Sequence, residues 1–231
     1  MKLLFSQTMT IVRHGFKIEW ANPERWLSPI LFAITMLILF SFSVGTIEGP
    51  DTAKLLVAET YLTAFFSLQI SFARFLEPDQ QDGVFSLLRT YPLSGSAWYL
   101  GKYITVMIMG LLILIPTIFL TSFLHAKSGV SLMSIPVITV AVTALSGMAA
   151  LGVLLSTMTM GSGSKQILYP LLYFPLTAPV LISAVEASKS ILVDNVNLQS
   201  LMSSWLGLLL IFGVMSFTLG ILLFGELVKA E

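Results

Sequence analysis

The sequence has 231 residues, of which 56% are hydrophobic and 10% charged, and its formal net charge is zero. Soluble domains average about 25% charged residues, so a water-soluble fold of this size could not hide its apolar surface. The sequence has no basic tract, which excludes a nucleic-acid partner, and no cysteine, which excludes disulfides, thiolate metal sites and cysteine nucleophiles.

Residues 1–22 are predicted to form an amphipathic helix in the membrane interface. Its apolar face, at helical spacing, consists of Phe5, Met9, Val12, Phe16 and Trp20. Its polar face consists of Ser6, Thr10, Arg13 and Lys17, and such a face points toward lipid headgroups. Asn22-Pro23 ends the helix, because proline removes a hydrogen-bond donor and restricts the residue before it. The charges along it argue against a cleavable signal peptide. The helix is either a simple surface anchor or an elbow that packs against the first crossing and a cytoplasmic partner.

Six stretches are long and apolar enough to span a bilayer, which takes about 20 residues. They are residues 26–47, 55–73, 103–124, 132–158, 166–185 and 201–225. An even number of crossings places both termini on one side of the membrane. With that side inside, nine Lys and Arg residues lie inside and three outside, which predicts cytoplasmic termini. We therefore expect a single transmembrane domain over 1–231, in a bacterial inner membrane.

The longest polar stretch, residues 74–102, joins the second and third crossings on the predicted cytoplasmic side. Asp79 or Asp82 is suited to cap a short helix that begins near Gly83. One face of this helix would carry Val84, Leu87, Leu88 and Tyr91. Pro92 would end it. The result is a short amphipathic helix outside the membrane.

A second cap is predicted directly after that helix. Ser94 or Ser96 can cap a helix that runs through Trp98 and Leu100 into the third crossing. The whole segment is either an ordinary capped return between two membrane helices or a lever that passes motion between a soluble protein and the bilayer.

The fifth crossing contains Pro170, Pro175 and Pro179. Each proline frees a backbone carbonyl that neighbouring groups must satisfy. This pattern predicts a helix that is kinked, or broken near its outer half. It would serve as a hinge or a substrate-facing wall, or the prolines are passive packing residues.

These two regions resemble the CcmB family, a membrane component of the cytochrome c maturation system that is often called the haem exporter permease. The residues that match in the loop are Glu77, Gln81-Asp82-Gly83, Leu87-Leu88, Pro92-Leu93-Ser94 and Gly101-Lys102. Those that match in the fifth crossing are Leu172-Tyr173-Phe174-Pro175-Leu176-Thr177-Ala178-Pro179, followed by Glu186-Ala187. The resemblance covers essentially the whole chain. It implies an all-α integral membrane fold of the ABC-2 (type V exporter) kind, with six transmembrane helices, an N-terminal interfacial helix and a cytoplasmic coupling helix.

The resemblance also implies partners. A cytosolic ABC ATPase subunit (CcmA-like) would contact an ATPase-coupling site at Glu77, Asp79, Asp82, Gly83, Leu87, Leu88 and Pro92. A haem-handling membrane subunit (CcmC-like), a small membrane subunit, a periplasmic haem chaperone and a second copy of this chain would complete the complex. ATP would bind the partner subunit, and its hydrolysis would release the haem-loaded chaperone. Haem is expected in the complex rather than as a cofactor of this chain.

We expect no catalytic or metal site in this chain. The segment Gly161-Ser-Gly163-Ser-Lys165 only superficially resembles a phosphate loop, because a serine separates the second glycine from the lysine. Another chain would therefore hydrolyse ATP. Glu59 and Glu186 are expected at the water boundary. His125 is expected to be solvated rather than a haem-iron ligand.

Three alternatives remain open. The first is a permease of the same architecture for a lipid or peptide, which would co-purify with an ATPase but with no haem-handling subunit. The second is an intramembrane enzyme, which would need paired carboxylates, a serine with histidine, or a metal cluster in the membrane. The third is a passive assembly subunit, for which charge reversal at Asp82 would leave cytochrome c assembly intact.

Overall fold

A computed structural model describes residues 2–44, 52–77, 94–159 and 165–230. Over these residues the chain is helical, with no strand. Its long helices are α1 (Lys2–Ala21), α2 (Glu24–Val44), α3 (Thr52–Arg74), α6 (Gly95–Leu124), α7 (Ile135–Met158), α8 (Lys165–Leu192) and α10 (Trp205–Ala230). Short helical turns are η2 (Ala126–Ser128) and α9 (Leu198–Leu201). The predicted all-α fold is confirmed.

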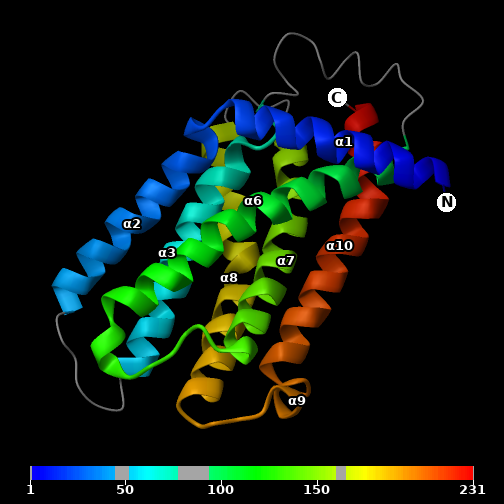
Figure 1. Cartoon of the computed structure of the whole chain (residues 1–231). Coiled ribbons are helices and arrows are strands. Elements are labelled where there is room, and N and C mark those ends of the chain that lie inside the picture. The colour runs from blue at the N-terminus through cyan, green and yellow to red at the C-terminus, as the bar shows by residue number, and fades with distance from the viewer. Residues whose placement is uncertain (1, 45–51, 78–93, 160–164, 231) are drawn as a thin grey trace.

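Six of the helices are long and apolar enough to cross a membrane, as predicted. They are α2, α3, α6, α7, α8 and α10. These helices run side by side, and α1 lies across one end of the bundle, where both chain termini are found (Figure 1). We call this the termini end; it comprises α1, the end of α3, the start of α6 and the end of α10. The opposite end, which holds η2 and α9, is the distal end.

The helix of the third crossing, α6, begins before residue 103, where the crossing itself was predicted to start, as the predicted serine cap requires. Ser94 is its N-cap, and its side chain accepts a hydrogen bond from the Ala97 N–H at 3.2 Å. The predicted serine cap is therefore confirmed. At 30 residues, α6 is about 45 Å long, which exceeds the roughly 30 Å hydrocarbon core. Its first turns consequently extend beyond the core and pack against α1.

The fifth spanning helix, α8, is one continuous helix from Lys165 to Leu192. Of the two predicted alternatives, the break is therefore wrong, and the kink stays a prediction. Pro175 and Pro179 lie on its exposed face. The opposite face is a column of buried side chains: Tyr169, Tyr173, Thr177, Val180, Ala184 and Ala187. Because this packed face holds α8 against α7 and α3, losing hydrogen bonds on the exposed face does not end the helix. Whether the prolines act as a hinge stays a prediction.

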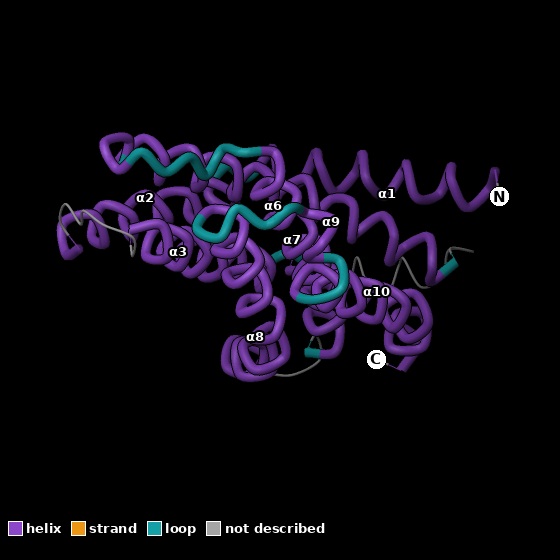
Figure 2. Tube along the Cα trace, turned by 90° about the horizontal axis from the view of Figure 1, so that it is seen from below, coloured by secondary structure: helices purple, strands orange, loops and turns teal. Residues whose placement is uncertain are grey.

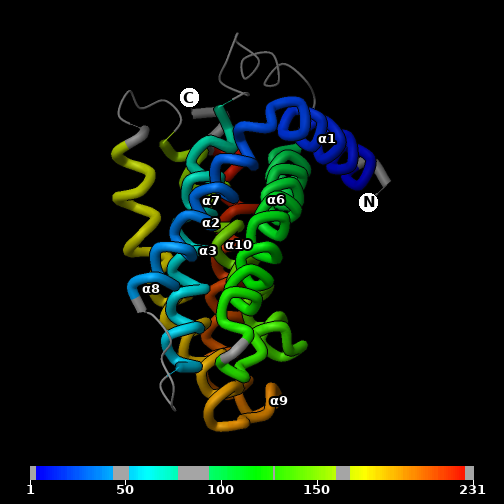
Figure 3. Tube along the Cα trace, turned by 60° about the vertical axis from the view of Figure 1, so that its left-hand side comes forward, coloured from blue at the N-terminus to red at the C-terminus, as the bar shows by residue number. Residues whose placement is uncertain are grey.

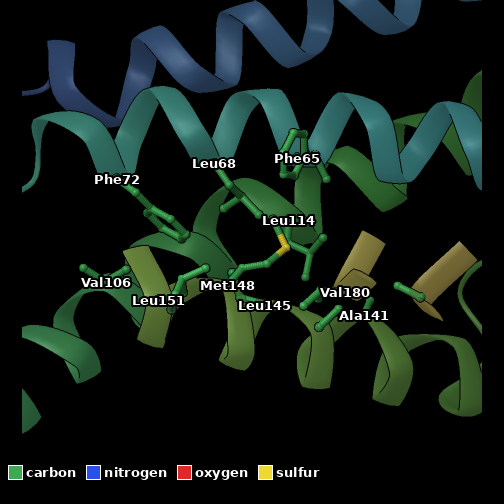
Figure 4. Close-up of a cluster of buried hydrophobic side chains, with 14 of the residues drawn as sticks. Phe65, Leu68, Phe72, Val106, Leu114, Ala141, Leu145, Met148, Leu151 and Val180 are labelled. Carbon is green, nitrogen blue, oxygen red and sulfur yellow. The ribbon is translucent and has the colours of Figure 1, made fainter. Parts of the chain in front are cut away.

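The core lies where α3, α6, α7 and α8 meet (Figure 4). Phe65 and Leu68 of α3 interdigitate there with Leu114 of α6 and with Leu145 and Met148 of α7. The void left between them is about 10 Å³, no more than a single water molecule needs. Seen along the bundle from the distal end (Figure 2), α7 lies between α6, α8 and α10. The core is therefore filled by side chains.

The outer faces of the bundle are apolar and exposed. Phe42 of α2 is 84% exposed and Ile211 of α10 is 71% exposed. A soluble protein would not leave such side chains in water over whole helices. These faces are suited to contact lipid.

Candidate coupling site

Of the predicted ATPase-coupling residues, only Glu77 lies in the described part of the chain. It lies three residues after the end of α3 and is half-buried. The others lie outside the described residues: Asp79, Asp82, Gly83, Leu87, Leu88 and Pro92. The structure does describe the residues on either side, which we call the α3 anchor (residues 74–77) and the α6 anchor (residues 94–102). Both anchors lie at the termini end of the bundle (Figure 1).

The α3 anchor is held by Arg25 at the start of α2. Its guanidinium donates a hydrogen bond to the Arg74 carbonyl oxygen at 2.5 Å. It also pairs with the Glu19 carboxylate of α1, Nε to Oε2 at 3.2 Å and a terminal nitrogen to Oε1 at 3.1 Å. Such a two-point contact with a carboxylate has a defined geometry, which a single ammonium cannot supply. Arg25 therefore joins α1, α2 and the last turn of α3.

The α3 anchor also packs on α6. Phe75 and Leu76 are buried directly after α3. The Lys102 ammonium of α6 lies 5.4 Å from the centre of the Phe75 ring, close enough for a cation–π interaction. This contact links the two anchors to each other.

The α6 anchor is held by α1. The Ser94 hydroxyl donates to Gln7 Oε1 at 3.5 Å, and the Thr8 hydroxyl donates to the Ala97 carbonyl oxygen at 3.5 Å. Both bonds are long and therefore weak. They nevertheless place the N-terminal half of α1 directly over the first turn of α6.

Glycines allow the close approach that these contacts need. A Cβ added at Gly101 would lie 2.6 Å from Ile11 Cγ2 of α1. A Cβ added at Gly95 would lie 2.5 Å from the Gly225 Cα of α10. Only residues without a side chain fit at these crossings. The start of α6 lies under α1 (Figure 3), and it crosses α10 closely where Gly95 meets Gly225.

These contacts support the elbow interpretation of α1. Thr8, Gly15 and Glu19 are buried against the bundle, whereas Phe5 is 69% and Trp20 is 58% exposed. The helix thus has a packing face in addition to the two faces predicted from the sequence. Its main contact is α6 rather than the first crossing. The first crossing, α2, touches it through the Arg25 pair and a Trp20–Trp26 stack at 5.8 Å.

At the distal end, two predictions are wrong, because Glu59 and His125 face each other instead of water. Glu59 is 6% exposed, and its Oε2 lies 3.9 Å from His125 Nε2. His125 Nδ1 lies 3.3 Å from the Thr121 carbonyl oxygen, which can only accept, so Nδ1 carries a proton. The pair ties α3 to the end of α6. Glu186, by contrast, pairs with Lys189 on the partly exposed end of α8, in agreement with the predicted water boundary.

Sequence reasoning missed the roles of Arg25 and Glu19, and it named Lys102 only as a family match without its contact with Phe75. A local signal existed for the first two, since opposite charges flank the Asn22-Pro23 break. Nothing local indicates that Arg25 binds a carbonyl of α3. Among the described residues, no group of three or more His, Cys, Asp or Glu could hold a metal ion.

The comparisons with known proteins agree with this arrangement. A family model described as CcmB protein matches residues 6–229, which include both anchors and all six spanning helices. The search of the curated proteins finds no match. A match over nearly the whole chain, on a helical bundle with six candidate spans, shows that the chain belongs to the CcmB family, the membrane permease subunits of haem-exporting ABC transporters for cytochrome c maturation.

Proposed function

We propose that this chain receives the force of cytosolic ATP hydrolysis through residues 74–102 and passes it to the bundle, so that the haem-loaded periplasmic chaperone is released. The observation that carries the proposal is the double anchoring of this segment. Arg25 holds its α3 end, and α1 with Gly95 holds its α6 end.

Because both ends of residues 74–102 are anchored, this segment is suited to transmit motion, rather than only to connect two membrane helices. A partner that displaces residues between the anchors pulls on α3 and α6 together. Through Glu19 the pull also reaches α1, and through the Gly95–Gly225 crossing it reaches α10. Because packed helices move as rigid bodies, the displacement is carried to the distal end rather than absorbed locally.

The distribution of charge supports cytoplasmic termini. Basic residues at the termini end include Arg13, Lys17, Arg25, Arg74 and Lys102, whereas Lys54, Lys127 and Lys189 lie at the distal end. An excess of Lys and Arg marks the cytoplasmic side. The anchors then face the cytosolic ATPase (CcmA-like), and the distal end faces the periplasmic chaperone.

The packed core supports chaperone release rather than passage of haem through the centre of one chain. The void between α3, α6, α7 and α8 is about 10 Å³, far too small for a porphyrin. Haem would therefore be handled in the complex, by the CcmC-like membrane subunit. That subunit, the small membrane subunit and a second copy of this chain would pack on the apolar outer faces.

The proposal is tested with variants of the anchors and of the segment between them. Arg25→Gln and Asp82→Lys should each insert normally in the membrane. They should nevertheless lower ATPase recruitment or stimulation and the yield of holocytochrome c. Lys189→Gln, which removes a cation at the distal end, is the matched control and should have no effect.

Two results would count against the proposal. If both variants support normal ATPase binding and normal cytochrome c assembly, the subunit is a passive assembly factor. If the ATPase co-purifies without any haem-handling subunit, the chain serves another substrate, such as a lipid or peptide.

A further inference from the structure

Two tyrosines near the start of α6 reach across to the middle of α7. Tyr99, within the α6 anchor, is fully buried, and its hydroxyl donates a hydrogen bond to the Ala150 carbonyl oxygen at 3.2 Å. The Tyr103 hydroxyl lies 2.7 Å from the Ser146 hydroxyl, so one of the two donates to the other. The tyrosines are four residues apart, and so are Ser146 and Ala150. The two bonds therefore join one face of α6 to one face of α7, one helical turn apart.

The sequence of α7 allows these bonds because the residues that face the tyrosines are small. Ala150 has only a methyl group, so the ring of Tyr99 can lie close enough for its hydroxyl to reach the backbone. A carbonyl oxygen has two lone pairs, so the Ala150 carbonyl can accept from Tyr99 and keep its bond within the helix. Tyr99 thus links α6 to α7 without interrupting α7.

The tyrosine rings are confined on their other side by α10. Phe217 of α10 lies 5.9 Å from the Tyr99 ring and 5.0 Å from the Tyr103 ring, measured between ring centres. The two tyrosines also stack on each other at 6.3 Å. Gly220 of α10 lies so close that a Cβ there would be 2.1 Å from the Tyr99 ring. Tyr99 is therefore held in the orientation that directs its hydroxyl at α7.

These hydroxyl bonds resist separation of α6 from α7. In the apolar interior a hydroxyl that loses its partner finds no water to replace it, and leaving it unpaired is costly. An apolar contact between the same helices, such as Gly110 against Leu145, has no preferred direction and tolerates sliding. A displacement of α6 alone would break both hydrogen bonds, whereas a displacement of α6 together with α7 keeps them.

We propose that Tyr99 and Tyr103 are positioning residues of the coupling step, which make α7 follow α6 when the ATPase displaces the α6 anchor. The inference rests on the coupling role proposed above for residues 74–102. It adds the route by which motion leaves α6. Because α7 packs against α6, α8 and α10, motion that reaches α7 is passed to the rest of the bundle.

The first test uses tyrosine-to-phenylalanine variants in the assembled complex with its ATPase. Tyr99→Phe with Tyr103→Phe removes both hydrogen bonds and keeps both rings. ATPase recruitment and stimulation should stay normal, because the anchors are intact. The yield of holocytochrome c should fall by about threefold for each lost bond, which is the typical effect of one hydrogen bond between membrane helices on an equilibrium.

Two matched variants control for the loss of a buried hydroxyl. Tyr169 also lies against α7, at Gly152, but its hydroxyl has no hydrogen-bond partner among the described residues. Tyr169→Phe should therefore keep the full yield. Tyr61→Phe breaks the buried 2.8 Å contact with the Ser188 hydroxyl, which joins α3 to α8. It should lower stability as the tyrosine variants of α6 do, yet keep the yield.

A distance measurement provides a readout that a purely stabilising role would not change. The chain has no cysteine, so spin labels can be placed at Ile104→Cys of α6 and Met158→Cys of α7, both of which are exposed. With Tyr99 and Tyr103 present, adding a non-hydrolysable ATP analogue to the complex should leave the distance between the labels unchanged. In the double phenylalanine variant the analogue should change this distance.

Two outcomes would overturn the inference and leave the coupling role intact. One is a full holocytochrome c yield in the double phenylalanine variant, while Arg25→Gln and Asp82→Lys lower ATPase stimulation as proposed. The other is a label distance that changes with the ATP analogue even when both tyrosines are present, since α6 would then move without α7. A full yield in all of these variants would instead refute the coupling role itself, and this inference with it.

Discussion

Replacing either partner of the Glu59–His125 pair should destabilise the protein by different amounts. In His125→Ala the Glu59 carboxyl stays buried, at 6% exposure, and loses the imidazole whose Nε2 lies 3.9 Å from its Oε2. Removing one partner of a buried pair costs about 3–5 kcal/mol. In Glu59→Gln the side-chain amide can donate to His125 Nε2, so we expect a loss below about 1 kcal/mol. Glu59→Ala leaves His125 Nε2 without its partner, which should lower the free energy of unfolding by about 1–3 kcal/mol.

The measurement is the free energy of unfolding of purified protein in mixed micelles titrated with a denaturing detergent. The expected order of destabilisation is His125→Ala, then Glu59→Ala, then Glu59→Gln. Glu186→Gln, which breaks the partly exposed pair with Lys189, serves as control and should cost less than about 1 kcal/mol. If His125→Ala is no less stable than Glu59→Gln, the carboxyl does not depend on His125, and the pair does not tie α3 to α6.

Four other substitutions test the close contact at Gly220, the cap of α6 and the role of the prolines in α8. Gly220→Ala should lower the free energy of unfolding by about 1–3 kcal/mol, because the new Cβ would lie 2.1 Å from the Tyr99 ring. Gly213→Ala is the control, because its new Cβ would have no contact closer than 3.8 Å. It should raise the free energy of unfolding by up to about 1 kcal/mol through helix propensity, and a thermal unfolding assay compares the two variants. Ser94→Ala should lower the free energy of unfolding by about 1 kcal/mol, because the N-cap hydrogen bond is lost. Amide hydrogen exchange should then be faster in the first turn of α6. An unchanged exchange rate there would contradict the cap. Pro175→Ala should leave the holocytochrome c yield unchanged, since this proline lies on the exposed face of a continuous helix; a lower yield at a normal membrane level would support the hinge.

Local sequence patterns were sufficient to predict the six spanning helices and the cap of α6. The six spans follow from the length of apolar runs, because a membrane helix satisfies its own backbone hydrogen bonds. The Ser94 cap likewise depends on residues within one turn. The family resemblance also came from short motifs, and the family match confirms it over residues 6–229.

The same reasoning failed for properties that depend on which helix faces meet. Glu59 and His125 lie far apart in the sequence, and each alone resembles a residue at the water boundary. Only the packing of α3 on α6 brings them within 3.9 Å. The prolines of α8 predicted a kink or a break. The break does not occur, because the side chains packed on the opposite face hold the helix together.

The sequence by itself determined the number of crossings, the amphipathic α1 and the cap of α6. Hydrophobic length, helical period and capping act over a few residues, so they can be read without knowing the neighbours. Only the tertiary structure decided that Arg25 closes on the Arg74 carbonyl and that α1 lies on α6 over Gly101. These contacts join distant segments, and their geometry exists only once the helices have packed.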